Sequence, residues 1–354
     1  MLNRVSRNPS GAREESTGRA LKPLTLVKRR LPTTSVVFDT YWRFAVERQE
    51  ILFRRLRGES EPWTADPILA TYKFTNAYRA ADRVSQYLIR HVIYGGRYDA
   101  TDSVFRILLF KLFNKIETWQ LLEESHGDLT TRNFDIQSID RTLMAALAGG
   151  ASIYSAAYIM PSGPIEVRQP RKHRMHLELL RQLIRDNFAN KLALATSMEE
   201  AYELLRTLPG IGPFLAYQFV IDLNYSGHLN FSEMEFVVPG PGARDGIRKC
   251  FTDLGDYSES DAIRWVAERQ DREFATRGLR FRSLWGRPLQ LIDCQNLFCE
   301  VDKYARVMHP DVTGLSGRTR IKQRFSAKLL PLQLWFPPKW GINTDHPTTG
   351  PSLL

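Results

Sequence analysis

The chain has 354 residues, of which 43% are apolar and 11% aromatic, so it can bury a large core and is neither wholly disordered nor collagen-like. Its 49 Lys and Arg exceed its 39 Asp and Glu, and the resulting net charge of +10 favours a polyanionic partner, most often nucleic acid. Three cysteines exclude a disulfide framework and an iron–sulfur cluster held by four cysteines. No metal site and no cofactor is predicted.

The positive charge is concentrated at the N-terminus. Residues 1–34 contain eight basic and two acidic residues, lack an apolar signal core and are rich in Pro, Gly and Ser, which predicts a disordered basic arm. The uncharged stretch 142–165 is too weakly hydrophobic to span a bilayer. We therefore expect a cytoplasmic protein that is not bound to a membrane.

Apolar residues recur at helical spacing from Ser35 onward, and strand signals are sparse. One helix is predicted to start at Ser35, a long one to run from Asp66 to about His91, and another to start at Thr101. Further helices are predicted over 138–149, 172–190, 197–207, 213–224, 243–254, 258–276 and 288–308, with one short strand candidate at 236–238. The sequence thus predicts an all-α domain over 35–312, followed by an irregular tail over 313–354.

The most informative motif lies within residues 201–224, AYELLRTLPGIGPFLAYQFVIDLN. One helix is expected to end at Thr207 and the next to start at Pro213, which is the pattern of a helix-hairpin-helix. The turn between them is Leu208, Pro209, Gly210, Ile211 and Gly212. The glycines allow a tight hairpin, Ile211 would pack between the helices, and the backbone N–H groups could hold a DNA phosphate without reading sequence. The alternative is an ordinary corner between two helices.

Carboxylates follow this turn at the spacing at which hairpin glycosylases place their catalytic acid. Breaking an N-glycosidic bond builds positive charge on the sugar, which a carboxylate can stabilise, or the carboxylate can activate water. We predict Glu235 for this role, with Glu233 and Asp222 as alternatives. The competing interpretations are a surface acid for Glu235 and a structural ion pair for Asp222. Strand-nicking hairpin glycosylases carry a lysine where this chain has Phe214, so a monofunctional enzyme that leaves an abasic site is expected.

Two predicted helices carry an unusual density of polar residues and, with two tyrosines, are expected to line a pocket for a flipped base. The predicted lining residues are Lys73, Asn76, Tyr154, Tyr158, Gln295, Asn296, Glu300 and Lys303. Solvated helix faces and, for the tyrosines, core packing are the alternatives. A further set of basic residues is predicted to contact DNA phosphates, although such clusters can also be solvated faces. This set consists of Arg171, Lys172, Arg174, Arg280 and Arg282.

Four blocks together carry a family resemblance: PWTADPILATYKFTNAYRAADRVSQYL, LPGIGPFLAYQFVIDLNYS, FVVPGPGARDGIRK and LQLIDCQNLFCEVDKYARV. Over residues 36–312 the chain resembles a helix-hairpin-helix, DNA-glycosylase-like group. That group includes the alpha-glutamyl/putrescinyl thymine pyrophosphorylases and the helical domain of 5-hydroxymethyluracil DNA kinases. The resemblance implies association with hypermodified bases in phage DNA, either making them or, in bacterial members, excising them as antiviral defence.

The activities within this group differ, and the chain has no GxxxxGK[ST] loop to cradle ATP, so kinase activity by this chain alone is not expected. We predict a monofunctional DNA glycosylase that flips and excises a hypermodified pyrimidine from double-stranded phage DNA in antiviral defence. Glucosylated hydroxymethylcytosine or a hydroxymethyluracil derivative is the expected substrate. The alternatives are a hypermodification transferase acting on pyrophosphorylated hydroxymethyluracil and a non-catalytic DNA-binding module. The sequence does not indicate a protein partner.

Overall fold

The computed structural model describes residues 29–156, 171–326 and 333–343. Within these ranges the chain is mostly helical, as predicted, and the strands β1 (Thr33–Thr34) and β2 (Phe251–Asp253) pair antiparallel. The predicted strand at 236–238 is a loop. None of the helices in the described ranges has the length and hydropathy that crossing a bilayer requires.

The helices follow the predicted order with few exceptions. They are α1 (Val36–Leu56), α2 (Pro67–Thr71), α3 (Arg83–Tyr87), α4 (Ala100–Phe113), α5 (Ile116–His126), α6 (Ile136–Ala148), α7 (Lys172–Arg185), α8 (Phe188–Ala193), α9 (Met198–Arg206), α10 (Pro213–Asn224), α11 (Pro241–Cys250), α12 (Glu259–Thr276) and α13 (Leu291–Met308). Three short helical turns accompany them: η1 (Arg79–Ala81), η2 (Leu88–Ile93) and η4 (Pro338–Trp340). Side-chain caps fix several starts, for example Ser35 before α1 and Ser258 before α12.

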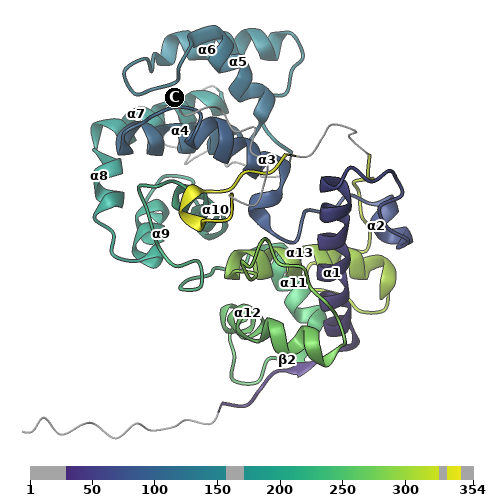
Figure 1. Ribbon diagram of the computed structural model, residues 1–354. Coiled ribbons are helices and arrows are strands. Elements are labelled where there is room, and N and C mark those ends of the chain that lie inside the picture. Colours follow the sequence, from purple (N-terminus) through teal and green to yellow (C-terminus); the bar gives the residue numbers. More distant parts are fainter. Residues whose placement is uncertain (1–28, 157–170, 327–332, 344–354) are drawn as a thin grey trace, which may run out of the picture.

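The helices form two groups, which Arg79 of η1 bridges by bonding Asp222 on α10 and Asp293 on α13. Figure 1 shows α4–α8 at the top, α9 and α10 below them, and α1, α2 and α11–α13 in the lower right. In the lower group α11 lies directly against α13, because a Cβ atom on Gly246 would stand only 1.9 Å from the Phe298 carbonyl oxygen. The segment between α2 and α4, which contains η1 and α3, joins the two groups.

The predicted long helix over 66–91 is wrong, because helix α2 ends after five residues. In the segment that follows, the backbone N–H of Thr75 donates to the Glu300 carboxylate at 3.0 Å, and that of Asn76 donates to the Asp82 carboxylate at 2.8 Å. These partners replace the i−4 carbonyls that a continuous helix would supply. The chain is therefore extended here and carries its polar residues across the face of α13.

The two flanking segments are partly described. Residues 1–28 of the predicted arm lie outside the described ranges, whereas Arg29 and Arg30 form ion pairs with Asp261 and Asp253. The predicted irregular tail follows α13, and its described parts contain only the short turn η4. Residues 333–343 cross between the two helical groups, where Leu334, Phe336 and Ile342 are buried.

Candidate functional site

Helices α9 and α10 are joined by the predicted tight turn. Gly210 has a φ of +77°, a conformation that glycine adopts without strain. Ile211 is 5% exposed, and its backbone N–H bonds the Leu208 carbonyl at 3.1 Å. Helix α10 starts at Pro213 with Gly212 as its N-cap and no side-chain cap. The positive end of the α10 dipole therefore lies at the turn without a capping side chain.

Asp222 lies at the centre of a buried charge cluster. Its carboxylate accepts two hydrogen bonds from the Arg79 guanidinium, at 2.6 and 2.9 Å, and lies 2.9 Å from the Lys111 ammonium. Burial raises the pKa of Asp222, but Arg79 and Lys111 outweigh that effect and hold the pKa below its usual value. Burial lowers the pKa of Lys111, although Asp222 opposes this shift. The cluster ties η1, α4 and α10 together.

The structure separates the two other predicted acids. Glu233 is 7% exposed, and its Oε1 accepts a hydrogen bond from the Arg287 guanidinium at 2.8 Å. Glu235 is exposed. The Arg264 guanidinium donates to its backbone carbonyl at 2.6 Å and not to its carboxylate. Two residues apart in a loop, the carboxylates thus point into different surroundings, and Glu233 is the enclosed one.

The C-terminal segment covers the region around Glu233. The Trp340 ring lies 3.8 Å from the Arg287 guanidinium, and Lys339 donates to the backbone carbonyls of Asn224 and Leu229. Burial lowers the pKa of Lys339 to about 8. Sequence reasoning missed Lys339 and Trp340, and it did not connect Arg287 with Glu233. The aromatic density of the tail was the available signal, but nothing local places the tail against α10.

Asp293 lies at the N-terminus of α13, close to the Asp222 cluster. Its carboxylate accepts hydrogen bonds from the backbone N–H groups of Arg79, at 2.8 Å, and of Gln290, at 3.0 Å. Burial nevertheless raises its pKa to about 7, and the nearby Glu233 adds to the shift. Asp293 therefore joins the start of α13 to η1 and belongs to the same polar region.

Five of the predicted pocket residues gather where the extended segment crosses α13. Glu300 pairs with Lys303 at 2.6 Å, and Asn296 donates to the Thr75 hydroxyl at 3.3 Å. The Lys73 carbonyl accepts from Lys303, and Asn76 bonds Arg48 at 3.0 Å. These side chains are thus close together, but they largely bond one another and the backbone.

The remaining pocket residues lie elsewhere. Tyr154 stacks on Phe113, with ring centroids 5.1 Å apart, and its hydroxyl bonds His176, so it belongs to the α4–α7 packing. Gln295 is 3% exposed, and its Oε1 has no hydrogen-bond partner among the described residues. Tyr158 lies outside the described residues. The predicted pocket is therefore not one continuous surface.

Some of the basic side chains predicted to contact phosphates are exposed, and others already interact with protein groups. Arg171, Arg280 and Arg282 are exposed, although the Arg282 guanidinium also lies 4.4 Å from the Phe53 ring. Arg174 is paired with Asp140 at 2.8 Å, and the Lys172 ammonium lies 4.7 Å from the Tyr154 ring. Arg174 and Lys172 therefore already have protein partners.

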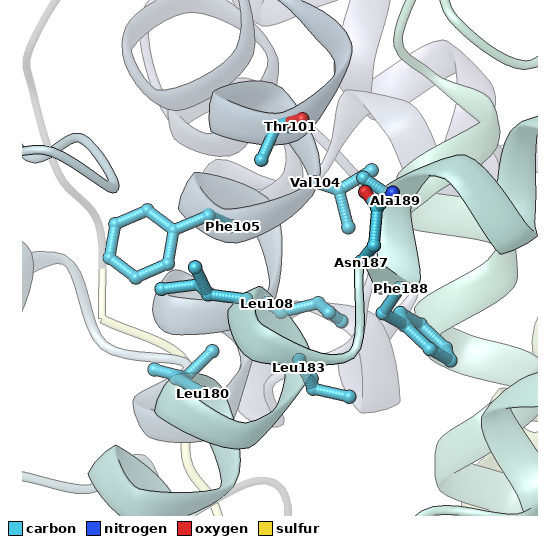
Figure 2. A pocket seen from close by; sticks show the side chains of 10 residues that line it. Thr101, Val104, Phe105, Leu108, Leu180, Leu183, Asn187, Phe188 and Ala189 are labelled. Atoms are coloured by element: carbon cyan, nitrogen blue, oxygen red, sulfur yellow. The ribbon is translucent and has the colours of Figure 1, made fainter.

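A small apolar pocket lies between α4, α7 and α8 (Figure 2). Leucine, valine and phenylalanine side chains dominate its lining, and Thr101 and Asn187 are its polar residues. It lacks the convergent polar groups that orient a base, so we do not place the site there. The described residues contain no group of three His, Cys, Asp or Glu arranged to hold a metal ion.

The chain belongs to the family described as "5-hmdU DNA kinase, helical domain", which matches residues 35–314. A relative from Bacillus phage SP10, named "5-hmdU DNA kinase", is 28% identical over 299 residues. The aligned region covers 78% of this chain and 46% of the relative, so the chain spans less than half the length of that protein. No solved structure matches the chain.

These findings contradict the predicted glycosylase. A kinase transfers a phosphoryl group, whereas the predicted enzyme would hydrolyse the bond between base and sugar. The predicted hydrolase activity, its abasic product and its role in antiviral excision are therefore wrong. The roles of Glu235, Glu233 and Asp222 in glycosidic cleavage fall with that reaction. The resemblance to the kinase helical domain is confirmed, while the wider glycosylase-like grouping stays a prediction.

Proposed function

We propose that this chain is a DNA-binding helical module in phage DNA modification. It would hold DNA containing 5-hydroxymethyldeoxyuridine so that a phosphoryl group is transferred to the hydroxymethyl oxygen of the base. The family match over residues 35–314 carries this proposal, and the name of the relative supplies the substrate. The proposal lies within the modification and DNA-binding alternatives and not with base excision.

In this proposal, ATP is bound by sequence outside the shared region. The aligned region covers only 46% of the relative, and the 354 residues of this chain contain no GxxxxGK[ST] loop. Phosphoryl transfer depends on a segment that cradles the nucleotide phosphates together with Mg²⁺. A separate polypeptide or a further part of the same enzyme would supply that segment.

The turn Leu208–Gly212 is the proposed contact to the DNA backbone. The positive φ of Gly210, the buried Ile211 and the start of α10 without a side-chain cap support this assignment. A turn of this kind offers backbone N–H groups and a helix dipole to a phosphate, and it does so for any base sequence.

Glu233 is the proposed contact to the hydroxymethyl group. Asp222 is enclosed by Arg79 and Lys111, and Glu235 is exposed. Glu233 is nearly buried, and Arg287 is its one ion-pair partner among the described residues. In kinases a carboxylate orients the acceptor hydroxyl and accepts its proton. Here the hydroxymethyl oxygen would bond to the γ-phosphorus as the bond to ADP breaks, and the proton would pass to Glu233.

The test compares two duplex oligonucleotides that differ only in one base, thymine or 5-hydroxymethyluracil. A hydrogen bond to a charged group contributes about 1.5–3 kcal/mol, so fluorescence anisotropy should show binding about 10-fold or more tighter to the modified duplex. Equal affinities would overturn recognition of the modified base. In a second arm, this chain alone is incubated with radiolabelled ATP and Mg²⁺. Labelled DNA would overturn the assignment of ATP binding to other sequence.

A further inference from the structure

The tail after α13 contains an exposed run of positive charge, residues 318–324, called here the basic ribbon. Its basic residues occupy every second position, and all of their side chains are exposed: Arg318, Arg320, Lys322 and Arg324. In the described part of the chain none of the four forms an ion pair, whereas Lys303 and Arg306 on the neighbouring helix α13 do. The positive charge of the ribbon is therefore not neutralised by acidic side chains of the described residues.

The backbone of the basic ribbon is held in place along its length. Just before it, the Ser316 N–H donates to the Asp245 carboxylate at 2.9 Å. Within it, the Arg306 guanidinium donates to the Arg320 carbonyl at 2.9 Å. At its end, the ribbon pairs antiparallel with segment 71–73. The hydrogen bonds engage the backbone on the protein side and leave the basic side chains to solvent.

The distribution of charge along the chain singles out this segment. Residues 35–312 contain 35 Lys and Arg against 36 Asp and Glu, so the helical domain is close to neutral. Residues 313–326 contain four basic residues and no acidic one. Among the described residues from the start of α1 onward, the ribbon therefore supplies the excess of basic over acidic side chains.

The spacing of these charges suits an extended polyanion. The ribbon pairs like a strand where it meets segment 71–73, and alternate residues of such a segment lie on one face, about 7 Å apart. A row of four cations on an anchored backbone matches a chain of phosphates better than a single compact anion, which would engage one or two of them. In Figure 1 the tail after α13 runs beside α2, away from the turn between α9 and α10. The ribbon is thus a different surface from the hairpin.

We propose that the basic ribbon binds the sugar–phosphate backbone of DNA as a second contact besides the hairpin. The identity of the polyanion rests on the proposed function. The segment paired with the ribbon continues into Lys73 and Asn76, next to Asn296 and Glu300 on α13. DNA held by the ribbon would therefore run past this polar cluster.

The experiment neutralises the ribbon and measures the salt dependence of binding to an unmodified duplex. Each phosphate contact contributes about 0.9 to the slope of log K against log salt, so the variant R318Q/R320Q/K322Q/R324Q should lower the slope by about 3.6. Between 50 and 200 mM salt the wild-type chain should then lose about 150-fold more affinity than the variant. Circular dichroism and thermal unfolding check that the variant is folded.

A matched control removes the same charge elsewhere. Arg97, Arg132, Arg141 and Lys191 are exposed, have no ion-pair partner among the described residues and belong to the α4–α8 group. The variant R97Q/R132Q/R141Q/K191Q should change the slope much less. An unchanged slope in the ribbon variant, or an equal change in both variants, would overturn the proposal. If the quadruple variant does not fold, R318Q/R320Q and K322Q/R324Q each test half of the effect.

The same titrations on the 5-hydroxymethyluracil duplex separate this proposal from the proposed function. The ribbon contacts only the backbone, so the affinity ratio between modified and unmodified DNA should be the same in the wild type and the ribbon variant. A lowered slope without any preference for the modified base would support the ribbon and reject the proposed substrate. A preference with an unchanged slope would reject the ribbon alone.

Discussion

Replacing Asp222 with asparagine tests whether the central charge cluster holds the two helical groups together. Asp222, Arg79 and Lys111 are 0%, 4% and 3% exposed. The substitution keeps the shape of the side chain but removes the negative charge that both cations approach within 3 Å. Arg79 and Lys111 would then face a neutral amide in a region from which water is excluded.

The expected loss is large because buried charges are poorly solvated. Removing one partner of a buried ion pair costs about 3–5 kcal/mol, and this carboxylate serves two cations, so we expect the upper part of that range. Lys111→Met is the informative comparison. This variant keeps the bidentate pair of Arg79 and Asp222. It removes an ammonium whose pKa is already lowered by burial, so the free energy of unfolding should fall by less than about 2 kcal/mol.

Urea unfolding at pH 7 measures both variants, and a shift of the midpoint at constant slope gives the change in stability. A loss below about 1 kcal/mol for Asp222→Asn would refute the reasoning, since it is smaller than any buried pair should give. Lys111→Met as costly as Asp222→Asn would also refute it, because the asymmetry follows from two cations sharing one carboxylate.

Three further predictions concern single residues. Burial raises the pKa of Asp293 to about 7, so between about pH 4 and 7 the folded state binds more protons than the unfolded chain, and stability falls as pH rises. Relative to wild type, Asp293→Asn should gain about 1.4 kcal/mol per unit between pH 5 and 7 in urea titrations, and a difference independent of pH would contradict this. Gly246→Ala, whose Cβ would stand 1.9 Å from a backbone oxygen of α13, should cost at least about 1–3 kcal/mol. Gly227→Ala has nothing within 4 Å of its Cβ and should change stability little, so equal melting temperatures would reject the close approach of α11 and α13. Glu233→Gln should weaken binding of the 5-hydroxymethyluracil duplex about 10-fold, whereas a matching loss in Glu235→Gln would exclude a specific role for Glu233.

The local sequence motifs did not predict the reaction correctly. The turn at Leu208–Gly212 predicted a tight connection between two helices, which is present, and the acids after it predicted a catalytic carboxylate. Neither feature distinguishes excision of a base from phosphorylation of it, because the same structural elements can serve different reactions. The family match over residues 35–314 overturned excision and carries the proposal of phosphorylation.

The sequence by itself determined what depends on neighbouring residues. Helical periodicity, Ser35 and Asp66 as caps, and the glycines of the hairpin set local torsion angles and local hydrogen bonds, so the positions of most helices could be predicted.

Only the tertiary structure decided which polar groups meet. The extended segment after α2 exists because Glu300, more than 200 residues away, accepts the hydrogen bond of Thr75, and Asp222 lies in an ion-pair cluster because α4 and η1 bring Lys111 and Arg79 to it. The sequence pattern favoured Glu235 over Glu233, and only the contact with Arg287 makes Glu233 the enclosed acid. Such partners are selected by packing between distant segments, since a buried charge or backbone N–H must find its counterpart wherever the fold supplies it.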